Sequence, residues 1–183
     1  MAHIQVEEGV PGIRSLVQFR PETGKPLYEL AQILLRGESL LNEAERELIA
    51  AYVSHRNNTM FCEMSHAAAS RHLYGEDKNI VDDVLKDADK ANISNKLKAL
   101  LHIAGKVQIL GKEVLPEDIE AARNEGASDK EIHDTVLIAA AFSMYNRYVD
   151  GLASFTPTDP AEYDVMGKRM AEKGYVSPQP EKL

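Results

Sequence analysis

The fold is decided by residues 128–154, SDKEIHDTVLIAAAFSMYNRYVDGLAS, the most hydrophobic long segment of the chain. Ser128 and Glu131 have the spacing of a capping box, which predicts that a helix begins at Asp129. Apolar side chains then recur every three or four residues along one face: Ile132, Val136, Leu137, Ala140, Ala141, Met144 and Tyr148. The segment is more apolar than a surface helix requires, so we expect a helix over residues 129–154 at the centre of a bundle or at a subunit interface.

The same helical period continues on both sides of this segment, and strand-like alternation is scarce. Capping residues and breaks predict further helices at residues 26–35, 43–56, 60–74, 79–87, 94–110, 116–125 and 160–173. The fold class is therefore all-α, a single-domain bundle of about seven or eight helices. We expect an N-terminal segment over residues 1–21, a helical domain over 22–174 and a polar, mobile C-terminal tail over 175–183 that contains Pro178 and Pro180.

Size, composition and charge indicate an ordinary globular protein. The chain has 183 residues, of which 44% are hydrophobic and 27% charged, and this is enough for one domain with its own core. The formal charge of -8 disfavours a broad nucleic-acid surface, because phosphate binding requires clustered Lys and Arg. The start, MAHIQVEE, lacks the basic and apolar regions of a signal peptide, and no stretch approaches the ~20 apolar residues of a membrane span. We therefore expect a cytoplasmic protein that does not contact membrane.

The only cysteine, Cys62, lies four residues before His66. On a helix these two side chains share a face, so the imidazole could accept the thiol proton. With Thr59 as N-cap, the sulfur would also lie in the first helical turn, where the helix dipole favours an anion. The alternative is that Cys62 packs in the core as a small apolar residue and His66 is a buried histidine with satisfied hydrogen bonds. From spacing alone the second interpretation is favoured, because free cysteine is among the most buried residue types.

Three segments add a family resemblance to this motif: residues 41–54, the turn from Cys62 to His66, and residues 142–152. Together they resemble the peroxidase-related branch of the carboxymuconolactone decarboxylase superfamily, which includes alkylhydroperoxidase D, and the similarity extends over roughly residues 10–170. The resemblance implies an all-helical fold of the alkylhydroperoxidase D type and a homo-oligomer, as a dimer, trimer or hexamer. We expect no cofactor and no metal.

The family motif consists of a glutamate, a C-x-x-C pair and a histidine. On this chain the resemblance gives the glutamate position to Glu47, the first cysteine to Thr59, the second to Cys62 and the histidine to His66. It implies a proton relay in which Glu47 orients His66 and His66 draws the proton from Cys62. Without the resemblance, Glu47 is interpreted as a solvated acid in the first turn of its helix.

Thr59 removes the cysteine that would resolve an oxidised Cys62 within the same chain. The favoured function is a thiol-dependent alkyl hydroperoxidase, an antioxidant oxidoreductase that uses one cysteine and an external thiol reductant. Thr59 would serve as the helix cap, or as an accessory hydroxyl beside the thiolate. Two alternatives stay open: a catalytically silent or small-molecule-binding protein, and a non-redox enzyme of the lactone decarboxylase type in which His66 and Glu47 perform acid–base catalysis.

The remaining chemical groups favour structural roles. His55 and His72 could extend the motif into a metal site, but the spacing of His72 from Cys62 and His66 does not share a helical face, which disfavours zinc. Arg147 and Asp150 are expected to form a structural ion pair. The aromatic side chains Phe142, Tyr145 and Tyr148 are expected in the core rather than around a cofactor.

Overall fold

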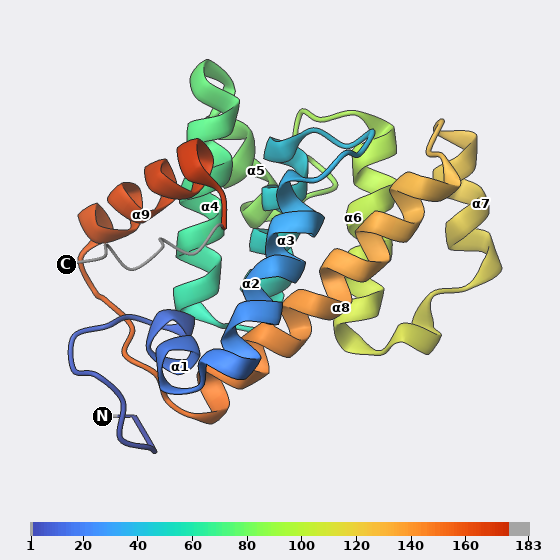
Figure 1. Ribbon diagram of the computed structural model, residues 1–183. Helices are drawn as coiled ribbons and strands as arrows, with labels where there is room; N and C mark the ends of the chain where they lie inside the picture. The colour runs from blue at the N-terminus through green and yellow to red at the C-terminus, as the bar shows by residue number, and fades with distance from the viewer. Residues whose placement is uncertain (1, 176–183) are drawn as a thin grey trace.

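The computed structural model describes residues 2–175, and these form nine α-helices, two short 3-10 turns and no strand (Figure 1). The helices are α1 (Ile13–Phe19), α2 (Pro21–Arg36), α3 (Glu43–Arg56), α4 (Met60–Tyr74), α5 (Asn79–Asp87), α6 (Asn95–Ile109), α7 (Pro116–Asn124), α8 (Asp129–Gly151) and α9 (Pro160–Lys173). The predicted all-α class is confirmed. Seven or eight helices were expected, and α1 is the additional one. No helix in the described part of the chain is long and apolar enough to cross a membrane.

The N-terminal helices differ most from the prediction, because tertiary contacts rather than local signals stabilise them. α1 has no side-chain cap and no acidic residue in its first turn, but Leu16 is fully buried. Gly12, which precedes α1, has a φ of 54°, and a Cβ there would lie 2.0 Å from the ring of Phe61. Only glycine therefore allows α1 to approach α4 this closely. α2 begins at Pro21 and continues through Pro26, the residue where the sequence predicted its start.

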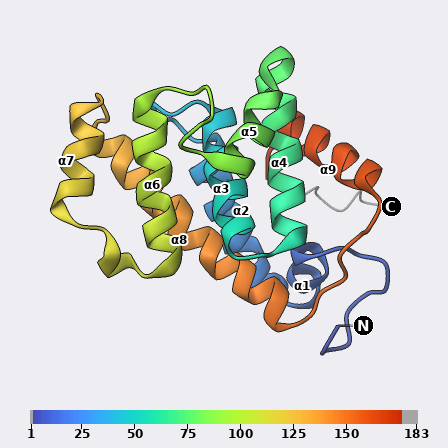
Figure 2. The ribbon, with the colours of Figure 1, turned by 180° about the vertical axis from the view of Figure 1, so that it is seen from behind.

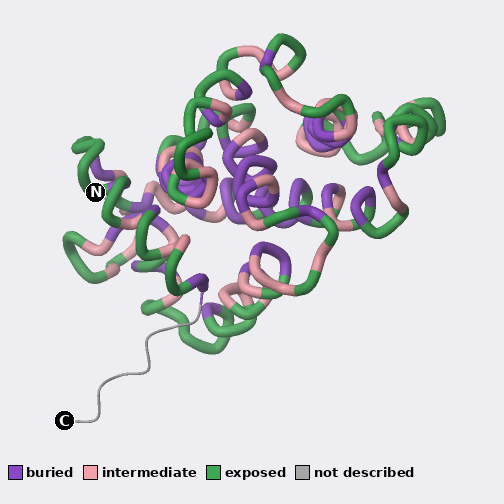
Figure 3. Tube along the Cα trace, turned by 90° about the horizontal axis from the view of Figure 1, so that it is seen from above, coloured by how far each residue is buried: buried purple, intermediate pink, exposed green. Residues whose placement is uncertain are grey.

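α3 is the central helix, and it packs against α4, α6 and α8. Asn42 and Glu45 form a capping box that begins it. Nine of its 14 residues are buried, and Figure 3 shows the buried segments gathered in the middle of the molecule. α8 begins with the predicted capping box at Ser128 and Glu131. Leu137 and Met144 of α8 are exposed. Only the opposite side of this helix therefore packs in the core.

α9 returns across the bundle and packs along α4 (Figure 2). The close approach depends on Gly167, where a Cβ would lie 2.5 Å from the Cβ of Ala68. α1 and α9 occupy one end of the molecule and α6 and α7 the other (Figures 1 and 2). After α9 the chain turns toward α2 and α3, where Tyr175 contacts Gln32 and Glu47.

Candidate active site

Glu47 is the buried centre of the site. Its side chain has no exposed surface, so it is not the solvated first-turn acid that composition alone suggested. Oε1 accepts hydrogen bonds from Nη2 of Arg36 at 2.6 Å and from the hydroxyl of Tyr175 at 2.7 Å, and Oε2 lies 2.7 Å from Nδ1 of His66. Three helices and the segment after α9 therefore meet at one carboxylate.

The charge of Glu47 is balanced by Arg36, which lies in the last turn of α2. The Arg36 guanidinium also donates to the carbonyls of Leu35 and Met170 and lies 5.3 Å from the ring centre of Tyr175. Burial alone would raise the pKa of Glu47, but the charges and hydrogen bonds of His66, Arg36 and Tyr175 outweigh it and lower the pKa. Glu47 is therefore an ionised carboxylate within the core.

His66 is oriented by this carboxylate. Nδ1 faces Glu47 and therefore carries the proton in the neutral ring, which leaves the Nε2 lone pair as an acceptor. Within residues 2–175, Nε2 makes no hydrogen bond. The ring is held edge-on against Phe142 at 4.5 Å and stacked with Tyr175 at 6.0 Å between ring centres. This arrangement is a carboxylate–imidazole pair with one free basic nitrogen.

Tyr175 is a site residue that the sequence analysis placed in the polar tail. Its backbone N–H donates to Oε1 of Gln32 at 2.7 Å, which fixes the chain where it leaves α9. Burial raises the pKa of Tyr175 well above its usual value, so the hydroxyl stays protonated and donates to Glu47. The only signal in the sequence is one aromatic residue at the start of a polar segment; residues 176–183 of the predicted tail, with both prolines, lie outside the described residues.

We expect Tyr175→Phe to lower the free energy of unfolding by about 1.5–3 kcal/mol, because it removes a hydrogen bond to a buried carboxylate and keeps the ring. Urea denaturation measures the change. Tyr163→Phe is the matched control, since its hydroxyl donates to the neutral carbonyl of Pro157 and should cost about 1 kcal/mol. Equal losses in the two variants would contradict a special role for the Tyr175 hydroxyl.

Cys62 lies in the first turn of α4, as expected, and its surroundings disfavour the thiolate. The residue is only 3% exposed. Burial raises the pKa of the thiol to about 12; the amide of Asn146 has a smaller lowering effect, and the charge of Asp150 raises the pKa further. No hydrogen bond joins Cys62 to His66 in the described part of the chain. Desolvation therefore outweighs the helix dipole at this thiol, and the burial of Cys62 agrees with the interpretation that the spacing alone favoured, in which it packs in the core.

Thr59 precedes α4 in the N-cap position, but its hydroxyl does not cap the helix. The residue is fully buried, and the hydroxyl donates to Oδ2 of Asp150. Arg147 does not pair with Asp150, because its guanidinium donates to the carbonyl of Ser143. The predicted ion pair between these two residues is therefore not found within residues 2–175. Thr59 thus joins α4 to α8 and contributes nothing to the cavity wall.

A cavity of about 380 Å³ lies beside the imidazole, bounded by α1, α2, α4, α8 and α9. Its volume falls in the range of ~300–1,000 Å³ that is usual for small-molecule sites. α4 contributes three polar groups to the wall, on Cys62, Ser65 and His66. Most other lining residues are apolar or aromatic, among them Ile13, Val17, Leu27, Phe61, Phe142 and Met166. The predicted core residues Phe142 and Tyr145 therefore also form part of this wall.

His55 and His72, which the sequence analysis considered as metal ligands, each lie beside a carboxylate outside the site. His55 lies 3.1 Å from a carboxylate oxygen of Glu63, and His72 lies 2.9 Å from one of Asp164. Within residues 2–175 no three His, Cys, Asp or Glu side chains are grouped so that they could hold a metal ion.

Comparison with known proteins agrees with this arrangement. Residues 21–106 match the Carboxymuconolactone decarboxylase family. The matched region runs from α2 to most of α6 and contains Glu47, Cys62 and His66. The predicted family is thereby confirmed. No curated protein sequence matches the chain.

Solved structures extend the likeness beyond the family region. A crystal structure from Ralstonia eutropha JMP134, described as an alkylhydroperoxidase AhpD core and an uncharacterized peroxidase-related protein, has 28% identity and a TM-score of 0.76 over 87% of this chain and 82% of that one. An uncharacterized peroxidase-related protein from Silicibacter sp. TM1040 also has 28% identity and a TM-score of 0.76, over 85% and 79%. A protein of unknown function from Agrobacterium tumefaciens, 21% identical with a TM-score of 0.71 over 87% and 100%, shares the fold. The alkylhydroperoxidase D-like fold is confirmed.

Proposed function

We propose that the protein is an acid–base enzyme in which His66, held by Glu47, transfers a proton to or from a small molecule in the cavity. The observation that carries the proposal is the position of the imidazole: Nδ1 is occupied by a buried, ionised carboxylate, and Nε2 has no partner within residues 2–175 while the residue lines the cavity. Glu47 stabilises the imidazolium that forms when Nε2 takes a proton. The protonated thiol of Cys62 is compatible with this chemistry, which needs no thiolate.

Decarboxylation illustrates how the pair would act. When a carboxylate substrate loses carbon dioxide, the electron pair of the broken C–C bond stays on the adjacent carbon as a carbanion. Imidazolium at Nε2 then gives that carbon its proton, and the ring returns to its neutral form. No electron acceptor is required. The test is whether lactone acids and related carbon acids exchange or gain a deuteron in D₂O with the wild-type protein but not with His66→Gln.

A second candidate, the one-cysteine peroxidase, is favoured by a different observation. Cys62 lines the same cavity as His66, and the two relatives with 28% identity are described as peroxidase-related. In that reaction Nε2 takes the thiol proton, and the thiolate attacks the terminal oxygen of a hydroperoxide. An S–O bond forms, the O–O bond breaks, and the alkoxide takes the proton from imidazolium. Two external thiols then reduce the sulfenic acid, releasing water and their own disulfide.

The pH dependence of Cys62 alkylation separates the two candidates. Because burial raises the pKa of the thiol to about 12, we expect iodoacetamide to react very slowly at pH 7 and the rate to keep rising up to pH 11. The same protein in urea is the control and should react as a free thiol with a pKa of about 8.5. A rate that levels off below pH 8, and loses that plateau in His66→Gln, would support the peroxidase. Cys62→Ser should retain acid–base turnover and abolish peroxide turnover.

For the oligomeric state we keep the inference of a homo-oligomer. It is supported by the exposed Leu137 and Met144 on the outer side of α8, since exposed apolar groups on one helix face favour association with another surface. The residues around Glu47 all come from one chain, so association is not required to form the acid–base pair.

A further inference from the structure

The wall of the cavity has an unusual charge. The protein contains 29 Asp and Glu residues and has a formal charge of -8, but within residues 2–175 no acidic residue and no lysine lines this cavity. Among the described residues, the charged side chains in the wall are Arg14 and Arg169, and the imidazole of His66 adds a basic nitrogen. The cavity therefore offers positive charge to a ligand in a protein that is otherwise acidic.

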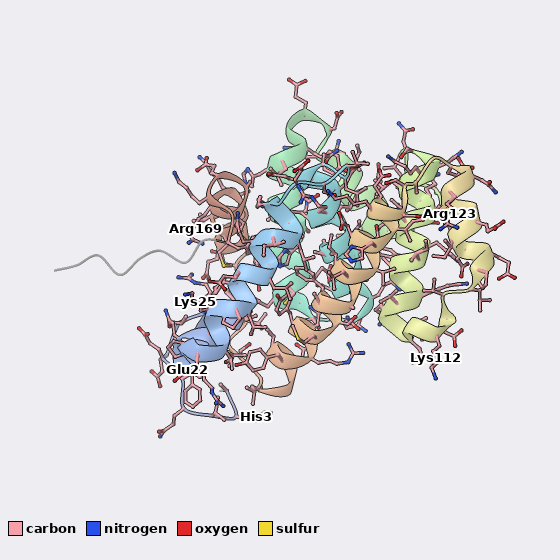
Figure 4. All side chains as sticks on the ribbon, turned by 45° about the vertical axis from the view of Figure 1, so that its right-hand side comes forward. His3, Glu22, Lys25, Lys112, Arg123 and Arg169 are labelled. Carbon is pink, nitrogen blue, oxygen red and sulfur yellow. The ribbon has the colours of Figure 1, made fainter. Side chains whose placement is uncertain are left out.

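Arg14 and Arg169 lie at the outer end of this cavity. Arg14 is on α1 and Arg169 on α9, and both are exposed. Figure 4 shows Arg169 on the same side of the molecule as Glu22 and Lys25 of α2, far from Arg123. Neither arginine forms an ion pair or a side-chain hydrogen bond within residues 2–175. Although burial raises the pKa of Tyr28, both arginines act to lower it, which indicates that they lie close to the same part of the wall.

Ser65 marks the inner end. It lies beside His66 on α4, lines the cavity and is only 3% exposed. Its hydroxyl has no hydrogen-bond partner within residues 2–175. A buried hydroxyl without a partner is unfavourable, so a ligand group that bonds to it gains affinity by satisfying it. Ser65 and Nε2 of His66 are therefore two adjacent polar groups at the closed end of an otherwise apolar cavity.

We propose that the cavity binds an organic monocarboxylate with an apolar body. Arg14 and Arg169 hold its carboxylate at the mouth, the apolar wall contacts its body, and Ser65 holds a polar group at the inner end beside His66. Arginine suits this task because its guanidinium matches a carboxylate with two parallel hydrogen bonds. The proposal rests on the proposed function in one respect: the inner polar group is where His66 would transfer the proton, and the carboxylate held at the mouth serves for binding and is not lost.

Calorimetric titration tests the anion site with straight-chain monocarboxylates from butanoate to decanoate and with the alcohols of equal length. We expect at least one acid to bind about tenfold more tightly than its alcohol, and Arg14→Gln and Arg169→Gln each to weaken that acid about fivefold without affecting the alcohol. Arg20→Gln and Lys168→Gln are matched controls, because each removes an exposed neighbouring cation that does not line the cavity. Their affinities should equal the wild-type value. Equal binding of acids and alcohols, no binding of any acid, or equal effects of all four variants would overturn the proposal.

Ser65→Ala tests the inner end. In the wild type we expect a hydroxyl at the far end of the preferred acid to increase the binding affinity. In Ser65→Ala the increase should be about threefold smaller. Ser143→Ala is the control, since Ser143 is also a buried hydroxyl without a partner in the described residues but lies outside the cavity wall. An unchanged preference in Ser65→Ala, or the same loss in Ser143→Ala, would remove Ser65 from the site.

These titrations need no turnover, so the two proposals can fail separately. If His66→Gln binds the acid normally but has lost turnover, both are supported. If it binds the acid and keeps turnover, the acid–base function is wrong and the carboxylate site stands. If acids bind no better than alcohols while turnover depends on His66, the carboxylate site is wrong and the function stands.

Discussion

Glu47→Gln should destabilise the protein by about 3–5 kcal/mol, the usual cost of removing one partner from a buried ion pair. The substitution keeps the size of the side chain but leaves the Arg36 guanidinium without its counter-charge in the core. It also brings an amide N–H₂ toward three groups that all donate to the carboxylate. Urea denaturation followed by circular dichroism gives the change in the free energy of unfolding.

Glu43→Gln is the matched control for this prediction. Glu43 lies one turn earlier on α3 and faces the same arginine at 3.4 Å, but its side chain is 41% exposed. Solvent screening should keep its loss below about 1 kcal/mol. Adding Arg36→Met to Glu47→Gln should recover part of the stability, because it removes the unpaired cation. The buried-pair argument is wrong if the two glutamine variants lose equal stability and Arg36→Met recovers none.

The same carboxylate makes stability depend on pH. The net lowering of the Glu47 pKa below its usual value of 4.5 means that the unfolded chain takes up a proton at this group before the folded protein does. The stabilisation is therefore fully present above pH ~5 and is lost as the pH falls through the folded pKa. Wild type should show a decrease in unfolding free energy in this acid range that is smaller in Glu47→Gln.

His66→Gln should reduce turnover of any acid–base substrate by about 10²–10⁴-fold, the usual contribution of a positioned proton-transfer group. Its effect on folding should be smaller than that of Glu47→Gln, because Arg36 and Tyr175 continue to neutralise and hydrogen-bond the carboxylate. Deuterium incorporation measured by NMR gives the rate. His72→Gln is the control, since that ring pairs with Asp164 on the surface and should leave the rate unchanged.

Three outcomes of this experiment separate the possible functions. A His66→Gln protein that is folded and fully active would refute the acid–base proposal. Peroxide turnover that disappears in Cys62→Ser and falls in His66→Gln would establish the one-cysteine peroxidase. A wild-type protein that binds acids but turns over neither class of substrate would support the binding protein without catalysis.

Local patterns predicted most of the helices because their ends carry side-chain signals. Asn42 and Ser128 cap α3 and α8 where the sequence indicated. α1 could not be predicted in this way, because it is short and uncapped and depends on a glycine that lets it approach α4. The pairing of Glu47 with His66 agreed with the family motif, whereas residue spacing alone favoured a solvated acid.

Two features of the site depend on contacts that no local pattern encodes. Tyr175 meets Glu47 across 128 residues of sequence, and it lies beyond the last helix that the sequence predicted. The thiol of Cys62 has the sequence context of an activated nucleophile, but its pKa follows from the burial of Phe61 and Cys62 in the first turn of α4, which pack against α1, α8 and α9. Periodicity identifies which face of a helix is apolar, but not whether water reaches a given atom on it.

The contact of Tyr175 with Glu47 also has a consequence for biosynthesis. Arg36, Glu47 and His66 are translated more than a hundred residues before Tyr175, whose hydroxyl completes the hydrogen bonds of the carboxylate. Until residue 175 has been translated, the nascent chain carries a carboxylate, a guanidinium and an imidazole without their last donor or the finished cover of α9. The complete hydrogen-bond network of the site therefore forms only after residue 175 has been translated, and a product that terminates before this residue would lack the hydroxyl donor to Glu47.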